Sequence, residues 1–281
     1  MSFNMLLADS GSTKTDWCLI QSGKKKYLDT QGINPYFLQQ HEIVSILEQE
    51  LKINPKKIAL DEIHFYGAGI NSTDKQKLIE RSLKEYFASS KVKSYSDMLA
   101  AARATCLHDK GIACILGTGS NSCFFDGKKI TFKTPALGYV LGDEGGATSL
   151  GKKLLQYYLH DIMEVDLKKQ FEARFEGLLE TALEQIYRGP FPNRFLAQFA
   201  RFIFEQRGHF MIENIAEDCL NDFFMNHLLR YPKVHQVPVH FSGSVAFHLQ
   251  DILKTLSEQY EIQVGKIIQK PIKGLVAYHS I

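Results

Sequence analysis

The sequence predicts an α/β fold in which mixed sheets are flanked by helices. Two observations carry this prediction. The first hundred residues begin with three short apolar segments joined by tight turns, and helices alternating with strands follow. The same opening of strand, small polar turn, strand, turn and strand starts again near residue 112. Hairpins followed by strand–helix units are typical of a mixed sheet covered by helices. The restart predicts an internal duplication, with Gly11 and Gly119 in matching places.

Apolar spacing predicts the elements of the first half in order. Residues 4–8 form a buried strand, a polar turn covers residues 9–15, and the second strand begins at Asp16. The complete series has strands over 4–8, 16–21 and 26–30, a helix over 42–51, a strand over 63–66, a helix over 73–87, a strand over 92–95 and a helix from Asp97.

The second half is predicted to be more helical. Its strands cover residues 112–116, 122–125, 130–132, 237–241 and 262–264, with a helical region over 149–229 that is interrupted at 189–193. A helix from Ser244 to about residue 257 follows the fourth of these strands, and Pro271 opens a short C-terminal helix. Because no low-complexity linker is present, we expect a domain boundary between residues 103 and 110.

The composition excludes several classes of protein. The chain has 281 residues, of which 44% are hydrophobic and 23% charged, so it is neither disordered nor collagen-like. Lys plus Arg total 33 and Asp plus Glu total 31, for a net charge of +2. The basic runs hold only two or three lysines, and we expect them on solvated faces. Nucleic acid and membranes are therefore not expected as partners.

Cysteine usage and the N-terminus indicate the compartment. Five cysteines, an odd number without a CxxC pair, argue against a disulfide framework or a zinc knuckle. The chain begins without the basic region of a signal peptide, and no apolar run approaches the ~20 residues that a membrane helix needs. We expect a cytoplasmic protein with reduced thiols.

Four glycine-rich segments carry the chemistry, and the first covers residues 9–16. Its turn of small residues can direct backbone N–H groups into one concavity and so bind an anion. The hydroxyls of Ser12, Thr13 and Thr15 and the ammonium of Lys14 would add donors. Asp9 at the strand end could hold a hydrated Mg²⁺ ion. The alternative is an ordinary polar hairpin.

The second segment, residues 117–122, is predicted to be a second phosphate-binding hairpin. A dinucleotide-binding fingerprint would need a helix after its glycines, whereas a strand follows here. The third segment covers residues 138–147, where Asp143 and Glu144 suggest metal or hydroxyl binding, with a solvated acidic turn as the alternative. The run that follows nearly spells a P-loop, but Lys153 stands where Ser or Thr is required.

The fourth segment, residues 241–246, is a strand that meets a glycine and then a helix. It would offer a flat edge for a nucleobase or ribose and a helix N-terminus for phosphate.

Taken in order, these segments resemble the sugar kinase/Hsp70/actin superfamily, and most of all the N-acetylglucosamine kinases of the BadF/BadG/BcrA/BcrD ATPase family. The resemblance covers nearly the whole chain. It rests on DSGSTKTDW (9–17), GINP (32–35), GAGINS (67–72), SD before an alanine-rich helix (96–97), GTGSNS (117–122), GDEGG (142–146) and FSGSVA (241–246).

The resemblance implies a fold and ligands. The fold would be two ribonuclease-H-like (actin-like ATPase) domains around a cleft, formed by residues 1–105 with the C-terminal helix 268–281, and by residues 106–267. ATP and Mg²⁺ would be the cofactors, and a small amino sugar phosphorylated at its 6-hydroxyl would be the substrate. Implied ATP-binding residues are Gly11, Ser12, Thr13, Lys14, Gly119, Ser120, Gly243 and Ser244. Implied sugar-binding residues are Asn34, Ser72, Thr118, Asn121 and Asp143.

The resemblance makes Asp97 the catalytic base, and the residues themselves allow that role. Phosphoryl transfer to a hydroxyl needs a positioned acceptor, neutralised phosphate charge and a base for the hydroxyl proton. Asp97 follows a strand and opens a helix, where the helix N-terminus favours a carboxylate. It could instead be only the N-cap. Likewise, Asn34 and Asn121 could be turn residues with a left-handed backbone.

Two other functions stay open at this point. Activator ATPases of 2-hydroxyacyl-CoA dehydratases bind an iron–sulfur cluster through cysteines at a dimer interface, one of them just before a glycine-rich segment, whereas residues 134–138 here read TPALG. A non-catalytic ATP- or sugar-sensing module would be expected to have lost a carboxylate, yet Asp9, Asp97 and Asp143 are all present. The sequence also leaves a homodimer open.

Overall fold

The computed structural model describes residues 3–11, 13–87 and 91–280. Ser12, predicted in the first phosphate turn, lies outside the described residues. Contacts divide the chain into two compact units, each taken by itself below. Unit 1 comprises residues 1–109, 127–129 and 270–281, and unit 2 comprises residues 110–126 and 130–269.

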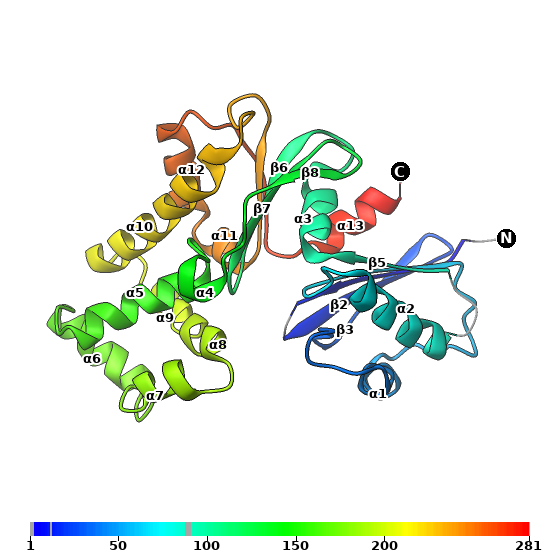
Figure 1. The fold of residues 1–281 in the computed structure, drawn as a ribbon, viewed down its shortest axis with the longest axis horizontal. Helices are drawn as coiled ribbons and strands as arrows, with labels where there is room; N and C mark the ends of the chain where they lie inside the picture. Colours follow the sequence, from blue (N-terminus) through cyan, green and yellow to red (C-terminus); the bar gives the residue numbers. More distant parts are fainter. Residues whose placement is uncertain (1–2, 12, 88–90, 281) are drawn as a thin grey trace. The chain divides into compact units, whose positions relative to one another are not determined.

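Unit 1 is a mixed sheet with helices on both faces (Figure 1). Within the described residues its strands lie in the order β3-β2-β1-β4-β5. The pairs β1/β2 and β2/β3 are antiparallel, whereas β1/β4 and β4/β5 are parallel. Its elements are β1 (Met5–Ser10), β2 (Lys14–Gln21), β3 (Lys24–Gln31), α1 (Gln40–Glu50), β4 (Glu62–Gly67), α2 (Thr73–Phe87), β5 (Lys91–Ser96), α3 (Asp97–Cys106) and α13 (Ile272–His279).

Alternation along β1 decides which face carries which chemistry. Leu6 and Ala8 belong to the apolar core that also contains residues of α1 and α2. Because side chains of a strand alternate between faces, Asp9 points to the opposite face. That face is covered by α3 and α13, which both contact β1 (Figure 1). Trp17 packs in the core, with its ring edge-on to Phe65 at 5.8 Å between centroids.

Unit 2 is a second mixed sheet with a larger helical region. Its strands within the described residues lie in the order β10-β9-β6-β7-β8. They are β6 (Gly111–Leu116), β7 (Ser120–Phe125), β8 (Ile130–Lys133), β9 (Val239–Ser242) and β10 (Val264–Ile268). The helices are α4 (Gly138–Leu141), α5 (Ala147–Leu159), α6 (Val165–Arg174), α7 (Ala182–Arg188), α8 (Pro192–Ala197), α9 (Ala200–Glu205), α10 (Phe210–Asn226), the 3₁₀ helix η1 (Leu228–Arg230), α11 (Ser244–His248) and α12 (Gln250–Gln259).

The two sheets have the same topology. The pairs β6/β7 and β7/β8 are antiparallel, and β6/β9 and β9/β10 are parallel, as are their counterparts in unit 1. The central strands β1 and β6 each run into a turn of small residues. This shared order supports the predicted duplication, and the predicted α/β class with mixed sheets flanked by helices is confirmed.

The first predicted turn was too long. The ladder between β1 and β2 continues to the pair Ser10 and Thr15, whose hydroxyl oxygens are 2.7 Å apart. The Gly11 N–H then donates to the Lys14 carbonyl at 2.9 Å. Asp9 and Asp16 are therefore strand residues that face one another in register.

Two later boundaries were also wrong. The predicted helix after Ser244 is broken at the buried Leu249, which separates α11 from α12. The last strand runs over Val264–Ile268 instead of residues 262–264. The reason is that Ile262 is a core residue whose N–H donates to the Ser257 carbonyl at 2.8 Å, after Glu261 has reversed the chain at φ 55°.

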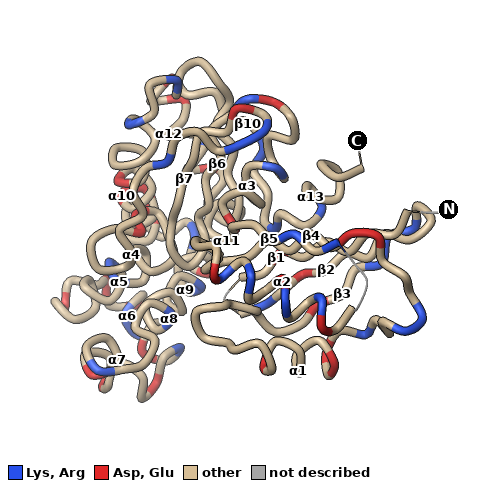
Figure 2. Tube along the Cα trace, turned by 45° about the vertical axis from the view of Figure 1, so that its right-hand side comes forward, with Lys and Arg blue, Asp and Glu red and all other residues tan. Residues whose placement is uncertain are grey.

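Charged residues of both signs are interspersed along each unit (Figure 2). Lys24, Lys25 and Lys26 are exposed on the edge strand β3, where lysines discourage pairing with another sheet. In the described part of the chain, no helix is both long enough and apolar enough to cross a membrane.

Candidate active site

The carboxyl ends of three parallel strands gather Asp9 and Asp97 at one edge of the unit 1 sheet. Asp9 of β1 lies opposite Tyr66 of β4, and Gly67 of β4 lies opposite Ser96 of β5. Asp97 follows directly as the first residue of α3. Ligands of open α/β sheets bind outside the carboxyl ends of strands, so this edge is the expected place for a site.

The charges of two other carboxylates, Asp16 and Asp97, act on Asp9. The pKa of Asp9 is raised to about 7, mainly by burial and also by the negative charges of Asp16 and Asp97, while the Lys270 ammonium acts in the opposite direction. No side-chain hydrogen bond to Asp9 occurs among the described residues. The edge therefore concentrates negative charge that a cation would neutralise.

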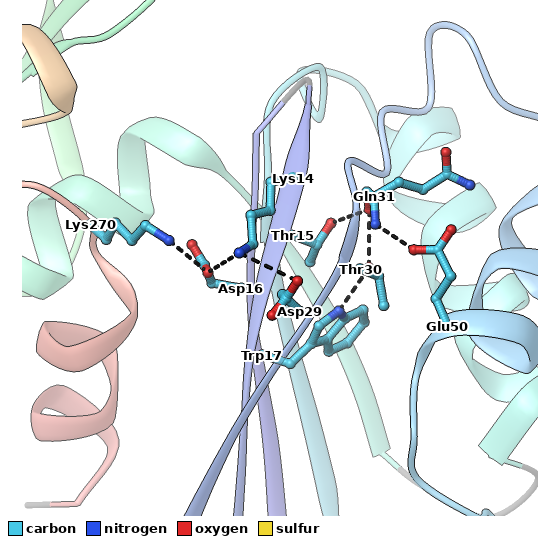
Figure 3. A network of polar contacts seen from close by, with 9 residues as sticks. All are labelled: Lys14, Thr15, Asp16, Trp17, Asp29, Thr30, Gln31, Glu50 and Lys270. Carbon is cyan, nitrogen blue, oxygen red and sulfur yellow. Dashed lines mark hydrogen bonds and ion pairs between the residues drawn. The ribbon is translucent and has the colours of Figure 1, made fainter.

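Of these three carboxylates, Asp16 forms ion pairs with lysines (Figure 3). The Lys270 Nζ atom lies 2.9 Å from its Oδ1 atom, and the Lys14 Nζ atom lies 3.9 Å from the same oxygen. Lys14 also pairs with Asp29 at 3.3 Å. Deeper in the sheet, the Trp17 indole N–H donates to the Thr30 hydroxyl at 3.0 Å, which fixes the base of the hairpin.

Asp97 is not the N-cap of α3. Ser96 has that role, because its hydroxyl accepts the Leu99 N–H at 3.3 Å. Asp97 is the first helical residue, is partly buried, and accepts the Met98 N–H on its Oδ1 atom at 2.7 Å. The capping explanation for a carboxylate at this position is therefore wrong, and the helix N-terminus stabilises its charged form.

The first turn is anchored to the segment that carries Asn34. The Ser10 hydroxyl donates to the Ile33 carbonyl at 3.0 Å and accepts the Ile33 N–H at 2.9 Å. Gly11, Thr13 and Lys14 are exposed above this anchor. Three predicted ATP-binding residues are thus open to a ligand, on a turn whose base is rigid.

Asn34 is buried and its amide oxygen accepts the Tyr36 N–H at 3.0 Å. Gly69, at φ +80°, packs so closely on Asn34 that a Cβ atom would overlap the amide. Neither Asn34 nor Asn121 has a positive φ, so the left-handed turn alternative is wrong for both. Ser72 is exposed at the start of α2, with its Oγ atom 3.4 Å from the Lys75 nitrogen.

The second turn, in unit 2, is built around a carboxylate. The Ser120 N–H donates to Asp143 Oδ1 at 3.2 Å. A Cβ atom on Gly119 would lie 2.5–2.7 Å from the three carboxylate atoms of Asp143, so only glycine fits there. The Ser120 hydroxyl is buried and has no hydrogen-bond partner among the described residues. This buried hydroxyl beside a turn of small residues is a candidate hydrogen-bond donor to a ligand.

Asp143 has a left-handed backbone, at φ 58°. Burial raises its pKa and Glu144 adds to this, whereas the Ser120 N–H, His227 and Lys152 lower it. Thr118 is exposed, and its carbonyl accepts the Thr148 N–H at 2.9 Å. These contacts fix the turn and the acidic segment as one piece.

Asn121 lies in β7, where its amide oxygen accepts the Ser122 N–H at 2.9 Å. Gly243, at φ +115°, lies against the end of β6, because a Cβ atom there would overlap the Leu116 carbonyl. Ser244 is exposed and begins α11. Unit 2 thus brings together the second and fourth glycine-rich segments, as expected from the neighbouring parallel strands β6 and β9.

The sequence did not reveal a pocket beside Glu144, the residue that follows Asp143. A cavity of about 470 Å³ in unit 2 is lined by Phe132, Thr134, Pro135, Leu137, Glu144, Asn226, His227 and Arg230. The His227 Nε2 atom lies 3.2 Å from a carboxylate oxygen of Glu144, although the two residues are 83 positions apart. No local pattern could have paired them.

No group of three or more His, Cys, Asp or Glu side chains arranged to hold a metal ion occurs in the described ranges. Mg²⁺ commonly keeps several waters in proteins.

Two units of one topology, each with a small-residue turn after its central strand, define an actin-like ATPase fold of the sugar kinase/Hsp70/actin superfamily. No family model and no curated protein matches the chain. Among solved structures, the chain is similar to a proposed N-acetylglucosamine kinase from Porphyromonas gingivalis, with 37% identity, a TM-score of 0.91 and 98% of each chain covered. At that identity the chain belongs to the N-acetylglucosamine kinase-like proteins of the BadF/BadG/BcrA/BcrD ATPase family.

More distant structures share the fold. A second proposed N-acetylglucosamine kinase, from Chromobacterium violaceum, has 16% identity and a TM-score of 0.71 over 98% of both chains. A ROK family glucokinase from Streptomyces griseus, solved with glucose and AMPPNP, has 12% identity and a TM-score of 0.58, with 99% of this chain and 98% of that chain covered.

Proposed function

We propose that this protein is an ATP-dependent kinase that transfers the γ-phosphoryl group to the 6-hydroxyl of an amino sugar, with N-acetylglucosamine as the first candidate. The observation that carries the proposal is the 37% identity over nearly the whole chain to a proposed N-acetylglucosamine kinase. The proposed domains are residues 1–105 with 268–281 and residues 106–267, and each would contain one of the two sheets of like topology. Because it would consume ATP, we expect the enzyme in the cytoplasm.

Asp97 is the proposed base. Its partly buried carboxylate lies at the carboxyl edge of the sheet, and Ser96, not Asp97, is the N-cap of α3. In the reaction the sugar hydroxyl gives its proton to the Asp97 carboxylate while its oxygen attacks the γ-phosphorus, and ADP leaves.

The two turns are the proposed phosphate sites. The backbone and hydroxyl groups of Gly11–Lys14 and the Lys14 ammonium would contact phosphate oxygens from one turn, with Ser12 included by resemblance. Gly119 and the unsatisfied hydroxyl of Ser120 would do so from the other. Gly243 and Ser244 would contact the adenosine.

A magnesium ion fits the acidic edge of unit 1. The raised pKa of Asp9 reflects burial and repulsion from Asp16 and Asp97, which a divalent cation would relieve. Asp9 would hold it through water, and the bound ion would neutralise phosphate charge.

Five residues are proposed to contact the sugar. Asn34 and Ser72 belong to unit 1, and Thr118, Asn121 and Asp143 belong to unit 2. An amide both donates and accepts hydrogen bonds, which suits hydroxyls and an acetamide. A fixed carboxylate such as Asp143 accepts from two adjacent hydroxyls.

The test is sugar-dependent ADP release by the wild type and by Asp97→Asn, over a panel of amino sugars. We expect turnover with N-acetylglucosamine that Asp97→Asn lowers by about 10³-fold or more, with ATP binding retained. Asp74→Asn is the matched control, since Asp74 is an exposed carboxylate in the first turn of α2. Normal turnover by Asp97→Asn would refute the assignment of the base.

The same panel separates the remaining alternatives. Tight binding of ATP and sugar without turnover would indicate a sensing module. A brown, air-sensitive protein would indicate an activator ATPase with an iron–sulfur cluster. The kinase is favoured over that activator because all five cysteines are buried and none lies in residues 134–138.

A further inference from the structure

A chain of hydrogen bonds runs behind the acidic segment of unit 2. The Tyr231 hydroxyl lies 2.8 Å from the Ser122 hydroxyl, which lies 2.7 Å from the Thr134 hydroxyl. The Thr134 hydroxyl lies 3.1 Å from His227 Nδ1, and His227 Nε2 lies 3.2 Å from a carboxylate oxygen of Glu144. The chain therefore joins β7, the end of β8 and the end of α10 to the residue that follows Asp143.

The donors and acceptors allow one direction in which every proton is used. The Thr134 N–H donates to the Tyr231 oxygen at 3.3 Å, so the Tyr231 hydroxyl donates onward to Ser122. Ser122 then donates to Thr134, and Thr134 donates to His227 Nδ1. Since a neutral imidazole has one donor and one acceptor, Nε2–H is left to donate to Glu144.

The hydrogen-bond network is deeply buried, so a donor or acceptor left without a partner in it would be costly. His227 is 5% exposed, Thr134 4% and Ser122 is fully buried. The Phe223 ring stacks on the imidazole at 4.8 Å and an interplanar angle of 19°, which holds its orientation. Removing one partner would leave a buried donor or acceptor unsatisfied, which is more costly than the loss of an exposed hydrogen bond.

Both ends of the acidic segment are thereby tied down. At one end the Ser120 N–H holds the Asp143 carboxylate at 3.2 Å. At the other, His227 holds one oxygen of Glu144, and the Asn226 amide donates to the second at 3.2 Å. The left-handed backbone of Asp143 lies between these two anchors, in a conformation that is uncommon for residues other than glycine.

We infer that His227, in its Nε2–H form, is a positioning residue that sets the orientation of the Asp143 carboxylate through Glu144 and so determines affinity for the sugar. The inference rests on the proposed function for the role of Asp143. The orientation itself depends only on the contacts within unit 2. It follows that losing the Glu144 contact should weaken sugar binding and leave nucleotide binding unchanged.

Two substitutions at one position separate this role from simple packing. The amide nitrogen of glutamine reaches about as far as Nε2 of histidine, whereas that of asparagine reaches only about as far as Nδ1. We expect His227→Asn to raise KM for the sugar about tenfold, with kcat and KM for ATP within about threefold of wild type. His227→Gln should restore most of the affinity. His235→Asn, on an exposed histidine, is the control.

A second measurement does not depend on activity. At pH 8, the ¹⁵N spectrum of the His227 ring, identified by its absence in His227→Gln, should show protonated Nε2 and unprotonated Nδ1. Amide exchange at Ser120 and Gly146, which bond to Asp143, should accelerate in His227→Asn and not in His227→Gln. The Gly243 amide, bonded to the Ile268 carbonyl at 3.0 Å, should be unaffected.

The outcomes are distinct. A protonated Nδ1, or equal exchange and kinetics in the two variants, would overturn the inference. A wild type that fails to phosphorylate any amino sugar but shows the expected spectrum and exchange would overturn the proposed function and leave the positioning role supported.

Discussion

The C-terminal helix α13 should loosen from unit 1 in mild acid, and His279 is the reason. Its Nε2 atom lies 2.9 Å from the Tyr66 hydroxyl, and its ring lies 4.2 Å from that of His64. The Arg103 guanidinium donates to the same Tyr66 hydroxyl at 2.7 Å and lies 4.9 Å from the centroid of the Tyr278 ring. The helix end is therefore docked against a second histidine and close to the Arg103 guanidinium.

This environment disfavours a charged imidazole. The pKa of His279 is lowered to about 3, mainly by burial and also by His64, Arg103, Lys93 and His108. In the unfolded chain the pKa of histidine is about 6.5. Between these two pKa values, His279 is protonated in the unfolded chain and neutral in the folded chain. The contribution of the neutral His279 to the free energy of unfolding is fully present above pH 6.5 and is lost as the pH drops toward 3.

The loss at pH 5 can be worked out. The solution is then about 1.5 pH units below the unfolded pKa, which at 1.36 kcal/mol per unit gives about 2 kcal/mol. That value is an upper one, because the imidazole is partly exposed and solvent screens part of the repulsion. His64 has a pKa that burial also lowers, so its contribution has the same sign.

Urea unfolding at pH 8 and pH 5 tests this, followed by the fluorescence of Trp17. Trp17 is the single tryptophan and is buried in unit 1, so its signal reports that unit. In His279→Gln the amide can still bond Tyr66 but does not titrate. The loss of unfolding free energy between pH 8 and pH 5 should therefore be smaller than in wild type by about 1–2 kcal/mol. The exposed His235→Asn should behave as wild type. Equal losses in His279→Gln and wild type would refute the reasoning.

Two further substitutions test close backbone packing. Gly119→Ala should lower kcat/KM by about 100-fold, because its Cβ atom would displace the Asp143 carboxylate, whereas Gly117→Ala meets no neighbour within 4 Å and should be tolerated in the same assay. Gly274→Ala in α13 should destabilise unit 1 by about 1–3 kcal/mol in the Trp17 unfolding assay, since its Cβ atom would overlap the Ala104 carbonyl of α3. An exposed helical glycine would instead gain stability on replacement by alanine, so a gain would contradict the contact.

The elements that could be predicted are those whose signal is local. Alternation and helical spacing located the strands and helices of unit 1 within a few residues, and α2 matches its predicted range. The failures arose where tertiary packing uses an apolar residue differently. Ile262 was predicted in a strand, but it enters the core as the chain leaves α12. Leu249 was predicted inside a helix, but it is buried at a break between two helices.

In the candidate site, too, the features with a local sequence signature were predicted and the long-range contacts were not. Glycine-rich turns have a sequence signature, so the segments with Gly11, Gly119 and Gly243 were found. The contact between Glu144 and His227 spans 83 positions, and a lone histidine in a helical region has no signature. Its role becomes visible only when β7, β8 and α10 are assembled.

Shared topology and different chemistry together explain why the duplication is faint in the sequence. In both units the central strand, β1 or β6, ends in a turn beside a parallel neighbour, β4 or β9. That order fixes where a ligand can approach each sheet, and it constrains mainly the turns. The side chains at each edge are free to diverge, so unit 1 carries Asp9 and Asp97, whereas unit 2 carries an unsatisfied Ser120 hydroxyl and a fixed Asp143. The fold could therefore be predicted from the order of the turns, but the chemistry of each edge had to be determined from its own contacts.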